Sequence, residues 1–191
     1  HVPFVAPTRS FKDYGIDKMK LPKVPEGDLE DLPKAAKQQS NANKYQMNEL
    51  DQRKSLRGYY ASVSYMDEQV GRVIDALDEL GLRSNTIVVF VSDHGFHLGE
   101  HTLWQKQSLM EESARVPLII SLPGDKKGVR SSRVVELIDL YPTLGELAGL
   151  KAPKVLQGQS LVNSLGVDDT PYPTEEALTQ VPVGFALRTP D

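Results

Sequence analysis

An acid, an imidazole and a lysine that could act together lie in the middle of the chain. Asp93 and His94 stand directly before Gly95, and Lys106 follows the histidine by twelve residues. A carboxylate and a neutral imidazole are oxygen and nitrogen ligands for a metal ion, and a lysine near a metal holds an anionic substrate group as a point charge. The alternative is a turn in which Asp93 caps a backbone amide and His94 is half exposed. Asp-His-Gly alone leaves both interpretations open, and the flanking sequence favours a site.

Two further histidines fall in the same stretch. With His97 and His101, three of the four histidines of the chain lie within eight residues. One interpretation places these two behind the metal ligands or at the rim of a pocket, and the other makes them exposed residues of a turn. The sequence gives the two interpretations equal weight.

A buried strand is predicted directly before the Asp-His pair, over Thr86–Ser92. β-Branched and aromatic residues fill this run, which is typical of a strand covered on both faces in a parallel sheet. Val116–Ser121 is a second run of this kind. Ligands bind beyond the carboxyl ends of the strands in open α/β sheets, which is where Asp93 and His94 are expected, and Gly95 is expected to let the backbone turn.

A long amphipathic helix is predicted over Asp51–Leu80. Its apolar residues recur every three or four positions, and Gly81 is a natural stop. Gly71 is expected to mark close packing against a sheet. The predicted class is therefore α/β, a mainly parallel sheet sandwiched by helices, with the two strands as neighbours or near-neighbours and this helix on one face. The apolar stripe consists of Tyr60, Val63, Met66, Val70, Val73, Leu77 and Leu80.

Composition narrows the class of protein. The chain has 191 residues, a net charge of -4 and no cysteine. It therefore has no disulfide and no thiolate site, and it shows no basic cluster for nucleic acid and no apolar run of membrane-spanning length. Residues 1–50 are expected to form a long surface loop, Leu140–Ala148 a helix, and Val183–Arg188 a last strand without a partner.

Several stretches together resemble the type I sulfatases of the alkaline-phosphatase-like superfamily. SDHGFHLGEHTLWQK is similar to the second signature region of that family, and YYASVSYMDEQVGRVIDALDELG, RVPLIISLPG, VVELIDLYPTLGELAGL and VLQGQSL are similar to its neighbours. The opening HVPFVAP resembles the segment that follows the sulfate-contacting histidine of the family. Within the family, the iduronate-2-sulfatase type is the closest resemblance.

The resemblance implies a role for each candidate residue. Asp93 and His94 correspond to metal ligands, with calcium as the implied ion, although a calcium site usually prefers oxygen ligands. Lys106 corresponds to the lysine that holds the sulfate and the ester oxygen. His1 corresponds to the histidine that contacts the sulfate near the leaving group, and it is a candidate acid. The implied activity is a sulfuric ester hydrolase that removes sulfate from a sulfated carbohydrate of glycosaminoglycan type, with a uronate 2-sulfate favoured by resemblance alone.

The chain departs from the family in what it lacks. The nucleophile is a formylglycine made from a C/S-x-P-x-R motif, and residues 121–125 have Asp125 where that motif needs arginine. The pair Asp168-Asp169 lies in a proline-rich stretch and cannot be the Asp-Asp pair of the family. The nucleophile and the other metal ligands are therefore expected N-terminal to His1. Residues 1–150 are interpreted as the later half of the catalytic domain, inactive alone and partnered by the N-terminal half of the same enzyme, and residues 151–191 as a linker and the first strand of a C-terminal subdomain.

Two rival functions remain open. A phosphonate or phosphate ester hydrolase of the same superfamily carries a similar Asp-His-Gly and lysine, and a non-catalytic relative would bind sulfated glycans. No nucleic-acid or membrane partner is expected, and the resemblance places the protein in a periplasmic, secreted or lysosomal compartment.

Overall fold

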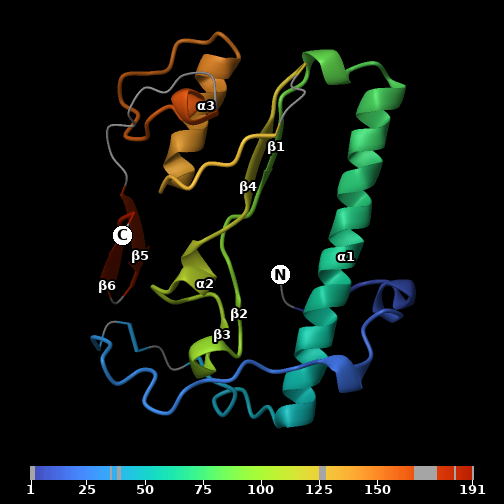
Figure 1. Cartoon of the computed structure of the whole chain (residues 1–191), viewed down its shortest axis with the longest axis vertical. Coiled ribbons are helices and arrows are strands. Elements are labelled where there is room, and N and C mark those ends of the chain that lie inside the picture. Colours follow the sequence, from blue (N-terminus) through green and yellow to red (C-terminus); the bar gives the residue numbers. More distant parts are fainter. Residues whose placement is uncertain are drawn as a thin grey trace. The chain divides into compact units, whose positions relative to one another are not determined.

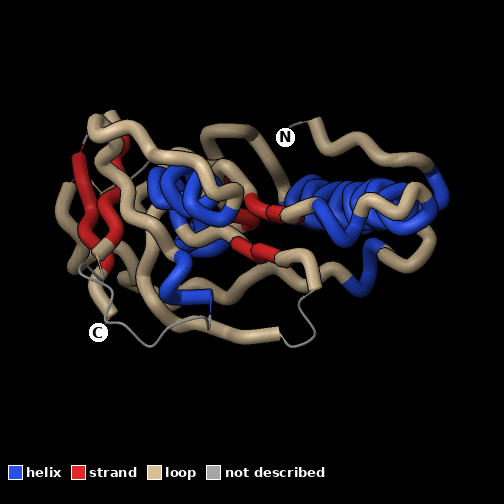
Figure 2. Tube along the Cα trace, turned by 90° about the horizontal axis from the view of Figure 1, so that it is seen from above, coloured by secondary structure: helices blue, strands red, loops and turns tan. Residues whose placement is uncertain are grey.

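The chain forms two compact units, His1–Gly124 and Asp125–Asp191. A computed structural model describes residues 3–34, 36–37, 40–124, 128–165, 176–182 and 184–190. Loops and turns make up much of the chain (Figure 2). The predicted boundary at residue 150 between a catalytic half-domain and a C-terminal subdomain stays a prediction. None of the helices in the described part combines the length and the hydropathy needed to cross a membrane.

Helix α1 (Glu49–Glu79) is the longest element of the first unit (Figure 1). Asn48 caps its N-terminus, because the Asn48 side chain accepts a hydrogen bond of 3.0 Å from the backbone N–H of Asp51. At the other end Gly81 has a φ of 66°, the left-handed conformation that glycine adopts readily after a helix. The predicted helix and its stop are confirmed.

Strands β1 (Val88–Val91) and β4 (Leu118–Ser121) lie side by side in a two-stranded ladder (Figure 1). They are neighbours, as predicted, but Val88 pairs with Ser121 and the strands run antiparallel. The prediction of a parallel pair is therefore wrong. An apolar run indicates that both faces of a strand are covered, and it carries no information about the direction of the neighbouring strand.

A short hairpin lies between these strands in the sequence. Strand β2 (His97–Leu98) pairs antiparallel with β3 (Trp104–Gln105), and helix α2 (Glu111–Ala114) follows. The remaining short helices of the first unit are 3-10 helices: η1 (Thr8–Phe11), η2 (Ile16–Lys18), η3 (Arg83–Asn85) and η4 (Glu100–Thr102).

The core of the first unit joins the N-terminal half of α1 to the hairpin. Its buried members are Met19, Leu56, Leu98 and Trp104. Met19 belongs to the segment expected as a surface loop, so that segment is partly packed. Arg53 ties it to α1, since its Nη1 donates a hydrogen bond of 2.8 Å to the backbone carbonyl of Met19.

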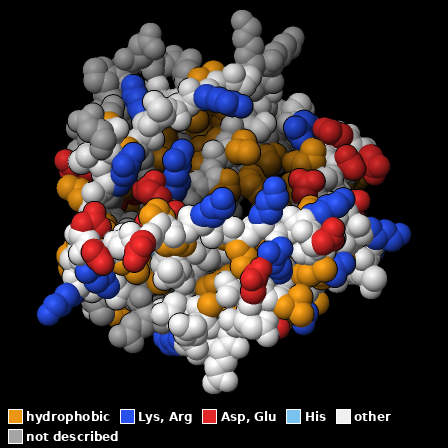
Figure 3. All heavy atoms as spheres, turned by 60° about the horizontal axis from the view of Figure 1, so that its bottom comes forward, with side chains coloured by type: hydrophobic (Ala, Val, Ile, Leu, Met, Phe, Trp, Pro, Cys, Tyr) orange, Lys and Arg blue, Asp and Glu red, His pale blue; other side chains and the backbone are white. Residues whose placement is uncertain are grey.

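The apolar stripe of α1 is only partly covered. The helix makes its most extensive contacts with η1, η2 and β2 rather than with the β1–β4 ladder. Further along, Val73 is 63% exposed and Leu80 71% exposed, and a Cβ added at Gly71 would meet open space. The expected cover of a sheet face by this helix is thus not found among the described residues. The face in Figure 3 also leaves hydrophobic side chains uncovered among interspersed charges of both signs.

The second unit contains one helix and one hairpin. Helix α3 (Leu140–Leu147) follows η5 (Leu137–Asp139), which confirms the predicted helix. Strands β5 (Ala177–Val181) and β6 (Gly184–Arg188) pair antiparallel, and η6 covers Val162–Leu165. The last strand is confirmed, but the prediction that it lacks a partner is wrong. Burial in β5 alternates with a period of two, a pattern that a proline-rich and polar neighbourhood obscures.

Candidate active site

The Asp93–His94 turn follows β1 directly. Ser92 Oγ donates a hydrogen bond of 2.8 Å to the backbone carbonyl of His94 and closes the turn. The Asp93 side chain is 71% exposed and the His94 side chain 24%. Asp93 Oδ2 lies 3.7 Å from His94 Nε2. Asp93 therefore takes little part in packing, and its carboxylate is open to solvent.

Two contacts define the protonation of the His94 ring. Nδ1 lies 2.7 Å from the carbonyl oxygen of Gly95, which only accepts, so Nδ1 carries a proton. Nε2 lies 2.7 Å from Lys106 Nζ, which only donates, so Nε2 accepts with its lone pair. A neutral imidazole whose Nδ1–H is held by a backbone carbonyl is the form in which histidine binds metals.

The structure brings Lys106 to the Asp-His pair. Lys106 Nζ and Asp93 Oδ2 lie 2.7 Å and 3.7 Å from the same atom, His94 Nε2. The ammonium and the carboxylate are therefore well within roughly 10 Å of each other, the separation that a small anion bound to a metal ion beside Asp93 could span to reach the lysine. Lys106 follows β3 directly, and the hairpin returns it to the end of β1. A separate pocket of about 360 Å³ opens beside Pro22 and Trp104, and it includes none of these three residues.

His1, the remaining predicted site residue, lies outside the described residues. Phe4 is a described residue near the N-terminus, and its ring packs against two other aromatic rings. Its ring centroid lies 5.4 Å from that of Phe96 and 5.5 Å from that of Tyr59, both in edge-to-face contact. Phe96 is two residues beyond His94, so the described start of the chain packs beside the Asp93–His94 turn.

Asp93 and His94 can supply part of the coordination shell of a metal ion. Their donor atoms are 3.7 Å apart, a spacing that one ion with bonds of about 2.0–2.6 Å can bridge. No group of three or more candidate ligands occurs in the part of the chain that the structure describes. The donor set therefore suits a divalent cation that takes its other ligands from elsewhere.

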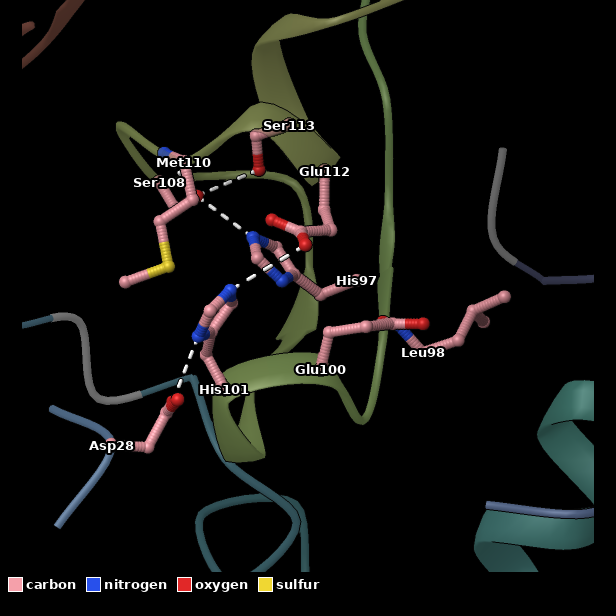
Figure 4. Close-up of polar contacts among 9 residues, drawn as sticks. All are labelled: Asp28, His97, Leu98, Glu100, His101, Ser108, Met110, Glu112 and Ser113. Carbon is pink, nitrogen blue, oxygen red and sulfur yellow. Dashed lines mark hydrogen bonds and ion pairs between the residues drawn. The ribbon is translucent and has the colours of Figure 1, made fainter. Parts of the chain in front are cut away.

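His97 does not belong to an exposed turn, so that interpretation is wrong for this histidine. The residue is 1% exposed, and its Nε2 lies 2.8 Å from Ser108 Oγ (Figure 4). Ser108 Oγ in turn donates a hydrogen bond of 2.9 Å to Ser113 Oγ in α2, so the imidazole Nε2 must donate to Ser108. Burial lowers the pKa of His97, which keeps the ring neutral.

Sequence reasoning missed the role of α2. Ser108, which precedes α2, contacts the His97 imidazole and donates a hydrogen bond to Ser113 of α2, and the backbone N–H of Gly95 donates a hydrogen bond of 2.8 Å to the carbonyl of Ser113. Gly95 itself does not have a positive φ. It is needed because a Cβ would overlap the carbonyl oxygen of Glu112.

Gly95→Ala should therefore push α2 away from the Asp93–His94 turn. Overpacking of this kind costs about 1–3 kcal/mol, so we expect the melting temperature to fall and the activity of the complete enzyme to fall with it. Gly145→Ala in α3 is the matched control, since a Cβ there meets nothing within 4 Å. Equal melting temperatures for Gly95→Ala and the wild type would contradict the close approach of Gly95 to the backbone of α2.

Comparison with known proteins assigns the chain to a family. The sequence profile described as Sulfatase matches residues 2–150. The chain belongs to the sulfatase family. Among sulfatases, it is 35% identical to the iduronate 2-sulfatase of Homo sapiens, over 80% of this chain and 35% of that protein. It is 34% identical to a sulfatase of Formosa agariphila, over 89% of this chain and 35% of that protein.

Solved structures agree on the fold of this sulfatase chain. A phosphonate monoester hydrolase from Silicibacter pomeroyi superposes with a TM-score of 0.79 and 26% identity, over 94% of this chain and 38% of that one. The α/β class of the alkaline-phosphatase-like superfamily is thereby confirmed. The chain spans about a third of the length of the relatives it matches, so it corresponds to one part of a longer sulfatase.

Proposed function

We propose that the complete protein is a sulfuric ester hydrolase that removes sulfate from a sulfated carbohydrate. The observation that carries the proposal is the contact of the Lys106 ammonium with His94 Nε2, which also lies 3.7 Å from the Asp93 carboxylate at the end of β1. An ammonium beside a carboxylate and a neutral imidazole is an arrangement suited to one anionic group held between a fixed charge and a metal ion. The name of the human relative, iduronate 2-sulfatase, favours a uronate 2-sulfate as the finer substrate.

Each residue has a distinct role in this proposal. Asp93 and His94 Nε2 hold a divalent ion, calcium by family resemblance, which when bound polarises the oxygens of the sulfate. Lys106 holds a sulfate oxygen and the ester oxygen, whose charge grows as the S–O bond breaks. In this structure its ammonium lies 2.7 Å from His94 Nε2; with that lone pair engaged by a metal ion, the ammonium would be free to contact the anion.

The remaining parts of the reaction come from outside the described residues. His1 is proposed to contact the sulfate near the leaving group and to protonate the departing alcohol. The formylglycine nucleophile and the other metal ligands are proposed to lie in the N-terminal half of the same enzyme. The cysteine or serine of a C/S-x-P-x-R motif upstream would support hydrolysis, and its lack would favour a non-catalytic glycan-binding relative.

A substrate comparison tests the activity. The complete enzyme should hydrolyse aryl sulfates and sulfated uronate disaccharides faster than the matching phosphate and phosphonate esters. The alternative, a phosphonate or phosphate ester hydrolase, is favoured by the fold match to a phosphonate monoester hydrolase. A higher kcat/KM on phosphonate monoesters than on any sulfate ester would select that alternative.

The uncovered stripe of α1 is proposed to pack against the N-terminal half of the same enzyme. Val63 is 42% exposed, Val73 63% and Leu80 71%, and the chain spans about a third of the length of its relatives, so ample chain exists to cover them. Monomeric proteins seldom leave an apolar face of this kind open.

Val73→Asp tests this contact. In the complete protein the substitution should lower stability by more than about 2 kcal/mol, since it buries an unpaired charge. In residues 1–191 alone it should change stability by no more than about 0.5 kcal/mol, as surface substitutions do. Arg72→Ala, a neighbouring exposed residue, is the control. A neutral effect of Val73→Asp in the complete protein would show that this face stays open.

A further inference from the structure

His101 lies between two carboxylates that come from distant parts of the chain. Its Nδ1 is 2.8 Å from Asp28 Oδ2, and its Nε2 is 3.4 Å from Glu112 Oε1 (Figure 4). Ionised carboxylates only accept hydrogen bonds, so both contacts are satisfied only when both ring nitrogens carry protons. A neutral His101 would leave a lone pair facing one of the two carboxylates. We name the contact of His101 with Asp28 and Glu112 the His101 bridge.

The other titratable groups around His101 do not oppose its protonation. The ring of His97, from β2, has its centroid 6.2 Å away, and that ring is neutral because burial lowers its pKa. The carboxylate of Glu100, in the same turn, accepts a hydrogen bond of 2.6 Å from the backbone N–H of Leu98. The charges that face His101 from neighbouring elements are thus the two carboxylates of the bridge.

The backbone at His101 is held in an unfavourable conformation. His101 has a φ of 54° and Thr102 a φ of 61°. The left-handed region costs about 1–2 kcal/mol for each L-residue with a side chain, and it is especially unusual for a β-branched residue. Tertiary contacts have to offset this cost, and the two ion pairs of the bridge are contacts that His101 itself makes.

The bridge lies next to the segment that carries Lys106. Residues 104–110, the Lys106 segment, comprise β3 and the stretch that leads from it to α2. At one end the N–H of Trp104 donates a hydrogen bond of 2.6 Å to the carbonyl of Ser40. At the other end Ser108 Oγ binds His97 and accepts from the N–H of Met110. The bridge adds a tie from Glu112 of α2 to Asp28, which belongs to residues 20–34, the Asp28 loop.

We infer that the protonated His101 is a positioning residue: it fastens the Asp28 loop and α2 to the β2–β3 turn and thereby fixes Lys106 for the anion. The consequence for Lys106 rests on the proposed function, whereas the bridge itself does not. The bridge is complete in mildly acidic solution, where His101 is protonated and both carboxylates are ionised, and it opens as the pH rises.

The electrostatics of the site agree with this direction. Burial alone lowers the pKa of His101, but the hydrogen bond to Asp28 and the charges of Glu112 and Asp28 outweigh it, so the pKa lies above the ordinary 6.5. A group whose pKa is raised by folding stabilises the folded state fully below its unfolded pKa. The stabilisation is lost as the pH rises through the folded pKa. The side chains of the bridge are 20–31% exposed, so solvent weakens the effect without removing it.

A titration of the complete protein tests the bridge without any need for turnover. NMR of ring-labelled histidine, with the signal assigned through His101→Asn, should give a His101 midpoint above 6.5, and Glu112→Gln should lower it. Hydrogen exchange at rates corrected for pH should show the Asp28 loop protected below this midpoint and exposed above it. In His101→Asn, which tolerates the left-handed backbone, the loop should be exposed at both pH values.

Sulfate binding and a double variant test the effect on Lys106. His101→Asn should weaken the affinity for inorganic sulfate, measured by calorimetry, and lower kcat/KM by about tenfold to a hundredfold through misplacement of the lysine. In a Lys106→Ala background it should cause no further loss. Glu68→Gln, which removes the exposed Arg9–Glu68 ion pair, is the control that should change none of these quantities.

Three results would overturn the inference. A His101 midpoint at or below 6.5, or equal protection of the Asp28 loop in wild type and His101→Asn, would remove the bridge. An equal further loss of sulfate affinity in the Lys106→Ala background would show a general effect on folding rather than an effect through Lys106. A protein that binds sulfate through Lys106 but hydrolyses no sulfate ester would refute the proposed activity and leave the inference intact.

Discussion

Asp93→Ala in the complete enzyme is expected to lower kcat/KM by at least about a hundredfold while the protein stays folded. The site loses a charged ligand that the other half of the shell cannot replace, and groups that stabilise developing charge are worth this much or more. The fold persists because the Asp93 side chain is 71% exposed, and substitutions at such positions change stability by about 0.5 kcal/mol or less.

The measurement is bound metal together with steady-state kinetics. Elemental analysis of the purified variant should show a lower metal content than the wild type, with an unchanged melting temperature in the presence of chelator. Asp93→Asn keeps the shape of the side chain and removes its charge, so its metal content and kcat/KM should lie between those of the wild type and Asp93→Ala. Asp67→Ala is the control, since Asp67 is an exposed carboxylate of α1. Unchanged metal content and turnover in Asp93→Ala would refute the assignment.

Local sequence was sufficient for the elements whose pattern repeats within a few residues. The spacing of apolar residues in α1, the cap at Asn48 and the stop at Gly81 all belong to one stretch of chain. Asp93, His94 and Lys106 were found for the same reason, since twelve residues and one hairpin connect them. The resemblance to the family added their roles, which remain proposals.

Features that depend on distant partners could not be predicted. The direction of β4 relative to β1 depends on the path of the chain between them, which apolar runs do not encode. Met19 becomes a core residue only because α1 and the hairpin meet it. His101 and Asp28 are 73 residues apart, so neither sequence neighbourhood shows that an imidazole and a carboxylate will pair.

The same distinction explains why His97 and His101 looked alike in the sequence and differ in the structure. His97 points into a buried pair of serines and is kept neutral by burial. His101 points between two carboxylates and is kept protonated by them. The chemical state of each ring is set by atoms supplied from α2 and the Asp28 loop, and neither partner is implied by histidine spacing.

Lys106→Ala is the second substitution with a large expected effect. In the complete enzyme kcat/KM should fall by about two or more powers of ten, because the lysine makes a charge-assisted contact that strengthens as charge develops on the ester oxygen. If Lys106 bound the ground state and the transition state equally well, KM would rise and kcat would stay the same. A loss in kcat as well as in kcat/KM therefore identifies a transition-state contact.

Two companion variants sharpen this test. Lys106→Arg keeps the charge but replaces a compact ammonium by a planar fork, so it should recover part of the affinity for inorganic sulfate and less of kcat. Lys54→Ala removes an exposed lysine in a helical ion pair with Asp51 and should leave both constants within about twofold, as expected for a surface pair. Wild-type kinetics in Lys106→Ala would mean that the contact of Lys106 with His94 is an incidental surface contact. The proposed site would then lose its fixed positive charge, and Asp93 and His94 alone would not account for recognition of an anionic ester.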